Sequence, residues 1–127
     1  MNCSELTDLL SIAAEGIHIH HIFPKESFPS IATSYENLIA ITPAQHLQNA
    51  HPGGNTRVVD KGYQYNLLVQ KTDTIRKNTD GLVGQPGFYS FDSYMNVLNT
   101  GLDTDIFSAI NYGDYRNVLT SISVFYR

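Results

Sequence analysis

The sequence predicts an α+β protein in which a small β part near the N-terminus precedes a mainly helical C-terminal half. Short runs with apolar and polar residues in alternation occur before residue 42, whereas apolar residues recur at helical spacing after residue 56. Neither an internal repeat nor a long linker separates the two parts. A length of 127 residues with 42% apolar residues suits one domain over 1–127.

The first elements predicted are a short helix and a strand. Residues 5–14 place leucines at helical spacing, which predicts a helix. In residues 17–20 isoleucine alternates with histidine, a pattern typical of a strand with one buried face, and Pro24 ends this strand. A loop over 25–36 and a second strand over 37–41 are predicted to follow.

The clearest local signal is the start of a helix at Pro43. Thr42 stands at the N-cap, proline occupies the first helical position, and Gln45 can bond back to the cap amide. The helix carries His46 one turn in. It ends at His51, because a residue before proline is disfavoured in the α region and two glycines follow.

Apolar stripes predict that the C-terminal half is helical. Its first helix runs to about Asn78, and a glycine-rich connector over 81–87 follows. Serine or aspartate precedes each of three later stripes, as expected of N-cap residues. The predicted caps are Ser90, Asp103 and Asp114, the predicted breaks are Gly101 and Gly113, and the predicted core residues are Tyr65, Leu68, Thr72, Ile75, Phe91, Tyr94, Met95, Leu98, Ile106, Phe107, Ile110, Tyr115, Val118, Leu119, Ile122 and Tyr126.

Charge is unevenly distributed along the chain. The formal net charge is -4, yet residues 55–78 are predominantly basic. A polyanion would therefore be attracted mainly to this block, although such charges more often form a solvated helix face. The basic residues of the block are Arg57, Lys61, Lys71, Arg76 and Lys77, with Lys25 as an outlier.

The cysteine content and the hydropathy of the sequence exclude several classes of protein. With Cys3 as its one cysteine, the chain cannot form an internal disulfide or a cysteine-rich zinc site, so a metal must be held by nitrogen and oxygen. No apolar run approaches the ~20 residues that span a bilayer, and no secretory signal is evident. We expect a cytoplasmic protein without a membrane partner.

All five histidines, His18, His20, His21, His46 and His51, lie within residues 18–51. Phosphodiester hydrolysis needs a base to deprotonate water and a cation to neutralise the phosphate and the leaving oxygen. The adjacent His20 and His21 can serve both needs only if the strand twists or ends between them, since a flat strand directs them to opposite faces.

The runs His20–Lys25 and Asn37–His46 together resemble the HNH (ββα-metal, His-Me finger) endonuclease motif. The likeness is to the His-His variant, similar to colicin-type DNases and HNH restriction-like nucleases, and covers about residues 17–56. It implies a ββα-metal motif packed against helical support over 57–127. It also implies His20 as a metal ligand, His21 as general base, Asn37 as the brace of the loop and His46 as a second ligand.

The sequence departs from the family pattern at the end of the helix. A further ligand often stands four residues after the first, but that position is Ala50 and histidine follows at His51. Residues five apart on a helix differ by ~140° in direction. His51 is therefore either a ligand brought round by the break before Pro52, or a phosphate contact or structural residue at the helix end. A site with only His20, His46 and waters is the alternative to a site with His51.

The resemblance implies a metal-dependent HNH endonuclease that hydrolyses DNA with one divalent cation. Mg²⁺ is expected, with Mn²⁺, Ni²⁺ or Zn²⁺ as alternatives, and Lys25, Arg57 and Lys61 are expected to contact nucleic acid. The acidic net charge favours a restriction-type or mobile-element nuclease that gains affinity as a homodimer, or one domain of a larger parent protein. The alternatives are an RNA-cleaving toxin or effector and a catalytically inactive metal-binding interaction module.

Overall fold

The computed structural model describes residues 18–41, 60–82 and 87–127, with the backbone alone at His18 and Ile41. Within these ranges the fold is α+β and mainly helical, as predicted, with a two-stranded antiparallel sheet and three α-helices. None of these helices is long and apolar enough to cross a membrane. The elements are β1 (His18–His21), η1 (Pro29–Ile31), η2 (Tyr35–Asn37), β2 (Leu38–Ile41), α3 (Lys61–Thr79), α4 (Phe91–Leu102), η5 (Ile106–Ala109) and α5 (Tyr115–Val124), where η marks a 3-10 turn.

The sheet pairs β1 with β2 so that His20 lies opposite Ile39 and His21 opposite Leu38. β1 ends at His21, before Pro24 as predicted, and β2 starts one residue later than predicted. Asn37 belongs instead to η2, where its amide donates to the carbonyl of Ser34 at 2.9 Å. This turn directs the Asn37 side chain into the loop rather than along the sheet.

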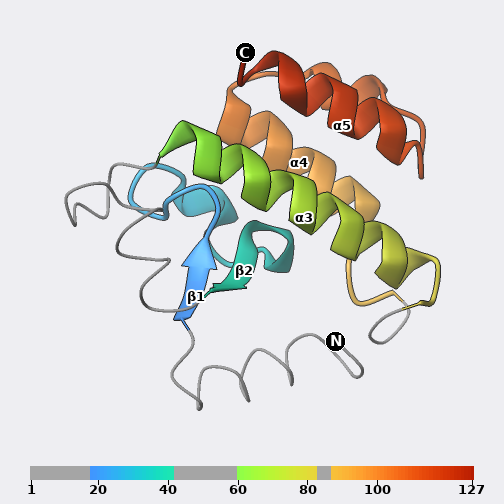
Figure 1. The fold of residues 1–127 in the computed structure, drawn as a ribbon, viewed down its shortest axis with the longest axis horizontal. Coiled ribbons are helices and arrows are strands. Elements are labelled where there is room, and N and C mark those ends of the chain that lie inside the picture. The colour runs from blue at the N-terminus through green and yellow to red at the C-terminus, as the bar shows by residue number, and fades with distance from the viewer. Residues whose placement is uncertain (1–17, 42–59, 83–86) are drawn as a thin grey trace.

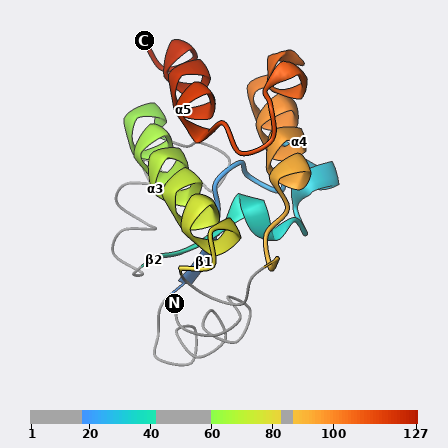
Figure 2. The same ribbon diagram turned by 90° about the vertical axis from the view of Figure 1, so that its right-hand side faces the viewer.

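The helices pack on one side of the molecule and the sheet lies on the other (Figures 1 and 2). α3 runs between the sheet and α5, while α4 contacts η2 and η5. The core is continuous from the loop after β1 through all three helices. Its buried apolar residues are Ile22, Phe23, Ile31, Leu67, Leu68, Ile75, Tyr89, Phe91, Tyr94, Met95, Val97, Leu98, Phe107, Tyr115, Val118 and Ile122.

Two of the predicted N-caps are confirmed. The hydroxyl of Ser90 accepts from the amide of Ser93 at the start of α4, and a carboxylate oxygen of Asp114 accepts from Asn117 at the start of α5. Asp60 caps α3 in the same way. Each side chain satisfies an amide that the first helical turn leaves without a partner.

Several predictions about the helical half are wrong. Gly101 does not break a helix but lies inside α4, and Asp103 is the C-cap of α4 with φ 53° rather than an N-cap. The residues after it form only the 3-10 turn η5, in which Phe107 is buried and Ile106 is 44% exposed. Leu119, also predicted to be in the core, is exposed on α5. Aspartate tolerates the left-handed conformation better than most residues, which explains the cap at Asp103.

Other predicted elements lie outside the described residues. They are the helix over 5–14, the helix over 43–51 and the middle of the glycine-rich connector, 83–86.

Candidate functional site

The candidate site begins with two adjacent histidines on β1. His20 is buried, with 1% of its surface exposed, whereas His21 is only partly buried. The strand passes through both and ends at His21, not between them, so the first of the two conditions stated for a joint role, a twist of the strand, is the one that such a role requires. Consecutive strand residues point to opposite faces, which agrees with the difference in burial.

The imidazole of His21 is held by the loop that joins the strands. Its Nε2 atom lies 3.0 Å from the carbonyl oxygen of Ala32. A carbonyl oxygen only accepts hydrogen bonds, so Nε2 must carry the proton. In the neutral ring Nδ1 then holds the lone pair, and the partial exposure of His21 leaves the ring accessible to water.

Asn37 holds the backbone that directly follows His21. Its Oδ1 accepts from the amide of Phe23 at 2.8 Å, and its Nδ2 donates to the carbonyls of Phe23 at 3.0 Å and Ile31 at 3.4 Å. Its own carbonyl accepts from the amide of Ile22 at 2.8 Å. Because Asn37 is fully buried, these bonds are shielded from water and fix the loop against the start of β2.

A further contact to this backbone comes from α3 and was not predicted from the sequence. Nε2 of Gln64 donates to the carbonyl of Ile22 at 2.8 Å, and Oε1 of Gln64 accepts from the hydroxyl of Tyr126 at 2.6 Å. The sequence feature that could have indicated this contact is the spacing of seven residues between Gln64, Lys71 and Asn78. This spacing places three polar residues on the buried face of a helix, where apolar residues are expected.

Helix α4 supports the loop at two points. Gly101 packs against the ring of Phe23, since a Cβ atom there would lie 2.5 Å from three ring carbons. A carboxylate oxygen of the buried Glu36 accepts from the amide of Ser90, the N-cap of α4, at 3.0 Å. An anion at a helix N-terminus is stabilised by the helix dipole. Asn37 and its neighbour Glu36 are thereby tied to different parts of the core.

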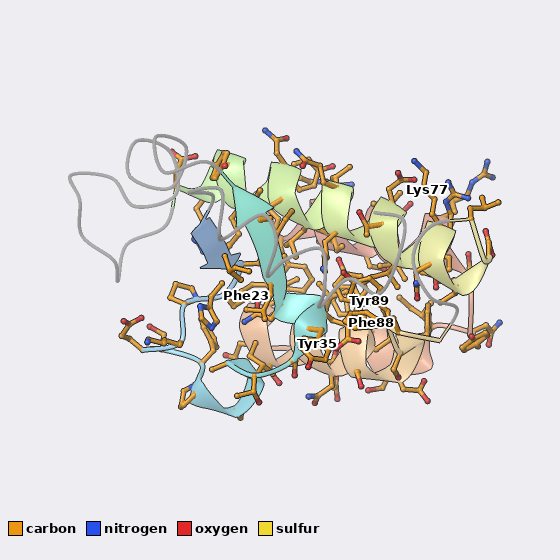
Figure 3. All side chains as sticks on the ribbon, turned by 90° about the horizontal axis from the view of Figure 1, so that it is seen from below. Phe23, Tyr35, Lys77, Phe88 and Tyr89 are labelled. Carbon is orange, nitrogen blue, oxygen red and sulfur yellow. The ribbon has the colours of Figure 1, made fainter. Side chains whose placement is uncertain are left out.

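An aromatic cluster lies beside the Glu36 contact. The rings of Tyr35 and Phe88 stack with centroids 5.0 Å apart, and Phe88 meets Tyr89 edge-on at 5.1 Å. Figure 3 shows the three side chains together, with Phe23 nearer the strands. The cluster covers the junction between η2 and α4.

Of the metal ligands that the sequence predicts, His20 alone lies in the described part of the chain; His46 and His51 fall outside it. Within that part, no group of three or more His, Cys, Asp or Glu side chains is placed to hold a metal ion. The donor chemistry of the predicted set is imidazole nitrogen. Imidazole suits Zn²⁺ and Ni²⁺ better than Mg²⁺, which prefers oxygen.

Two of the three residues predicted to contact nucleic acid lie in the described part of the chain. Lys25 and Lys61 are exposed, and Arg57 lies outside the described residues. Lys61 stands one turn before Gln64 on α3, and Lys25 lies in the loop after β1.

Lys71 of the basic block does not contribute to a surface that could attract a polyanion. Lys71 is 1% exposed, and its Nζ donates to the hydroxyl of Tyr89 at 2.5 Å. It therefore cannot meet a polyanion at the surface. Burial of a lysine is rare unless the ammonium has partners, and here the Tyr89 hydroxyl is one of them.

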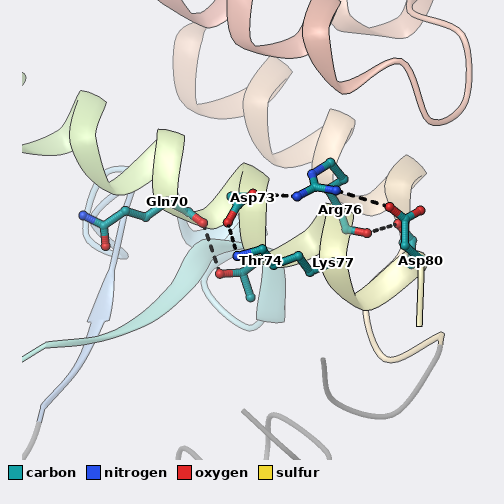
Figure 4. A network of polar contacts seen from close by, with 7 residues as sticks. Gln70, Asp73, Thr74, Arg76, Lys77 and Asp80 are labelled. Atoms are coloured by element: carbon teal, nitrogen blue, oxygen red, sulfur yellow. Dashed lines mark hydrogen bonds and ion pairs between the residues drawn. The ribbon is translucent and has the colours of Figure 1, made fainter. Parts of the chain in front are cut away.

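Arg76 and Lys77 are engaged by neighbouring carboxylates near the end of α3 (Figure 4). Arg76 pairs with Asp73 at 3.1 Å and Asp80 at 3.4 Å, and Lys77 pairs with Asp73 at 2.9 Å. Hydrogen bonds from Lys77 and Arg76 lower the pKa of the Asp73 carboxyl. Figure 3 shows Lys77 at the end of α3 away from Phe23, so this network is remote from the candidate site.

Comparison with known proteins does not assign a function to this chain. No protein-family model, curated protein or solved structure matches this chain.

Proposed function

We propose that the protein is a metal-dependent endonuclease of the HNH type that hydrolyses DNA phosphodiester bonds. The observation that carries the proposal is the loop held by Asn37 directly after His21. A general base must be fixed within hydrogen-bond reach of the water it deprotonates, and its orientation is commonly set by a further group. In this chain the ring is held by Ala32 and the backbone by Asn37.

In this proposal Nδ1 of His21 takes the proton from the attacking water. The Ala32 carbonyl keeps the other ring nitrogen protonated and fixes the direction in which the lone pair points. As the proton arrives at Nδ1, the carbonyl also stabilises the imidazolium that forms. The same arrangement, a base oriented by a hydrogen-bond acceptor, recurs in unrelated hydrolases.

His20 is the metal ligand of the described part, with His46 and His51 proposed from the sequence. A bound divalent cation would act as Lewis acid on the scissile phosphate and the leaving oxygen. An imidazole nitrogen is a suitable ligand, and the burial of His20 would exclude water from that side of the metal. The site residues therefore fit Mn²⁺, Ni²⁺ or Zn²⁺ at least as well as Mg²⁺.

Lys25 and Lys61 are proposed to contact phosphates of the substrate, together with Arg57. Lys71 is buried and Arg76 and Lys77 are paired with a carboxylate, so the described part of the basic block presents a reduced cationic surface to a polyanion. Such a surface supports weak binding by charge alone. This favours the proposal that affinity comes from a homodimer or from a larger parent protein.

The test compares wild type, His21→Gln and His21→Ala on supercoiled plasmid, an oligonucleotide duplex and a structured RNA. Each reaction contains Mg²⁺, Mn²⁺, Ni²⁺ or Zn²⁺, with EDTA as control. Glutamine keeps an N–H donor for the Ala32 carbonyl but cannot accept the proton from water. We expect His21→Gln to fold as wild type and to lose ~100-fold or more in cleavage rate, the range of a lost general base.

Other outcomes would redirect the proposal. DNA cleavage that survives in His21→Gln removes His21 from the role of base. Cleavage of RNA without DNA favours the RNA-cleaving effector. Metal binding without cleavage of either substrate favours the interaction module, in which His21 serves only to hold the loop.

A further inference from the structure

The C-terminal tail is connected to the backbone next to His21 by two consecutive hydrogen bonds. Tyr126 donates from its hydroxyl to Oε1 of Gln64 at 2.6 Å, and Nε2 of Gln64 donates to the carbonyl of Ile22 at 2.8 Å. Ile22 follows His21 directly in the chain. Residues far apart in the sequence are therefore linked through one side chain of α3.

Each group in this chain of contacts has a defined role as donor or acceptor. Gln64 is 3% exposed and uses its carbonyl oxygen and its amide nitrogen on different partners. Burial raises the pKa of the Tyr126 hydroxyl, which stays protonated and remains a donor. The Tyr126 ring also packs on Tyr65 with centroids 5.5 Å apart, which holds the hydroxyl in place.

Ile22, the residue after His21, is held on both sides of its Cα atom. Asn37 accepts from the amide of Ile22 at 2.8 Å, in the peptide that joins it to His21, and Gln64 donates to the carbonyl of Ile22 at 2.8 Å, in the peptide that joins it to Phe23. Neither contact touches the imidazole. Together they fix the backbone that leads away from His21.

We propose that Gln64 and Tyr126 are positioning residues, which set the orientation of His21 for proton transfer through the Ile22 carbonyl. The inference rests on the proposed nuclease function. It assigns a role in the reaction to the residues after α5, which contribute no group of their own to the site. Displacement of a catalytic group by about 1 Å can lower a rate ~100-fold, so a distant hydrogen bond can affect turnover strongly.

The experiment measures kcat and KM for Gln64→Met and Tyr126→Phe, with Gln70→Met and Tyr94→Phe as matched controls. Gln70 lies exposed on the same helix, and Tyr94 is a buried tyrosine bonded to Thr72 and Leu68 of the core. We expect kcat to fall ~100-fold in Gln64→Met and ~10-fold in Tyr126→Phe, with KM unchanged within about twofold. The controls should keep the wild-type kcat, even though Tyr94→Phe lowers thermal stability.

Amide hydrogen exchange at Ile22 and Phe23 gives a second readout that does not need activity. Exchange should accelerate ~10-fold or more in both variants while amides of α4 stay protected. Wild-type exchange at Ile22 and Phe23 would overturn the inference, as would an equal loss of kcat in Tyr94→Phe. If the wild type cleaves no substrate, the proposed function fails, and the exchange rates alone decide whether Gln64 and Tyr126 hold the His21 backbone.

Discussion

The loop over residues 22–37 and the three helices are held in place by different kinds of contact. In the loop, buried side chains bond directly to backbone groups, as Asn37 does at Phe23 and Gln64 does at Ile22. In the helices the backbone is paired internally, and apolar stripes meet in the core. The loop thus depends on a few individual hydrogen bonds, whereas the helices depend on apolar area spread over many side chains.

The two regions should therefore tolerate substitutions differently. A core of many apolar contacts loses stability in increments when one side chain changes. A loop whose buried amides and carbonyls have one partner each loses a specific conformation when that partner is removed, because an unsatisfied buried polar group is costly. The loop follows His21 and contacts its ring, so the geometry of the candidate site is expected to depend on the more sensitive of the two regions.

Asn37→Ala should have the largest effect. It removes three side-chain hydrogen bonds and leaves the buried Phe23 amide without its acceptor. With ~1–3 kcal/mol for each unsatisfied group, we expect a loss of about 3 kcal/mol in the free energy of unfolding. Urea denaturation measures it against Asn66→Ala, an exposed position on α3. An equal, small effect in both variants would remove the distinction between the two regions.

High pH should have the second largest effect, by destabilising the helical region. Burial raises the pKa of Tyr94, and the folded state therefore keeps a proton that the unfolded chain releases above pH 10. Stability from this group is complete below pH 10 and falls as pH rises further, by up to ~1.4 kcal/mol per pH unit. Denaturation at pH 9 and pH 11 measures it. Tyr94→Phe should flatten the dependence, whereas Tyr112→Phe, at an exposed tyrosine, should not.

Gly101→Ala tests the boundary between the regions. Alanine favours a helix by about 1 kcal/mol over glycine, but its Cβ would lie 2.5 Å from the buried Phe23 ring. Overpacking costs ~1–3 kcal/mol, so the net expectation is a loss of about 1 kcal/mol. In the proposed nuclease reaction, displacement of Phe23 should also lower the cleavage rate, because Phe23 lies two residues after His21. A gain in stability would mean that the loop moves to accommodate the Cβ atom without a loss in the free energy of unfolding.

Asp73→Asn should have the smallest effect. The pKa of Asp73 is lowered by Lys77 and Arg76, so its contribution is present above the ordinary carboxyl pKa and is lost as pH falls below it. The side chains of the network are 40–53% exposed, and we expect a change below about 0.5 kcal/mol at neutral pH that vanishes in 1 M salt. Thermal melts at low and high salt measure it. A loss above 1 kcal/mol would show that this surface network matters as much as the loop contacts.

Much of the fold was predictable because it depends on local signals. Apolar residues at helical spacing predicted α3, α4 and α5, and Ser90 and Asp114 were recognised as caps. The predictions failed where a distant contact decided the outcome. Gly101 has the usual signature of a helix break, yet it lies within α4, which ends at Leu102, and its missing side chain leaves room for the ring of Phe23.

For the candidate site, the sequence shows which chemical groups are present: adjacent histidines on a strand and an asparagine close to the next strand. The packing of the chain sets the contacts of those groups: Asn37 bonds the Phe23 backbone, the Ala32 carbonyl bonds His21, and Lys71 is buried. It also brought Gln64 and Tyr126 to the same loop. The physical reason is that helix periodicity and capping depend on residues a few positions apart, whereas the partner of a buried polar group depends on how the whole chain packs.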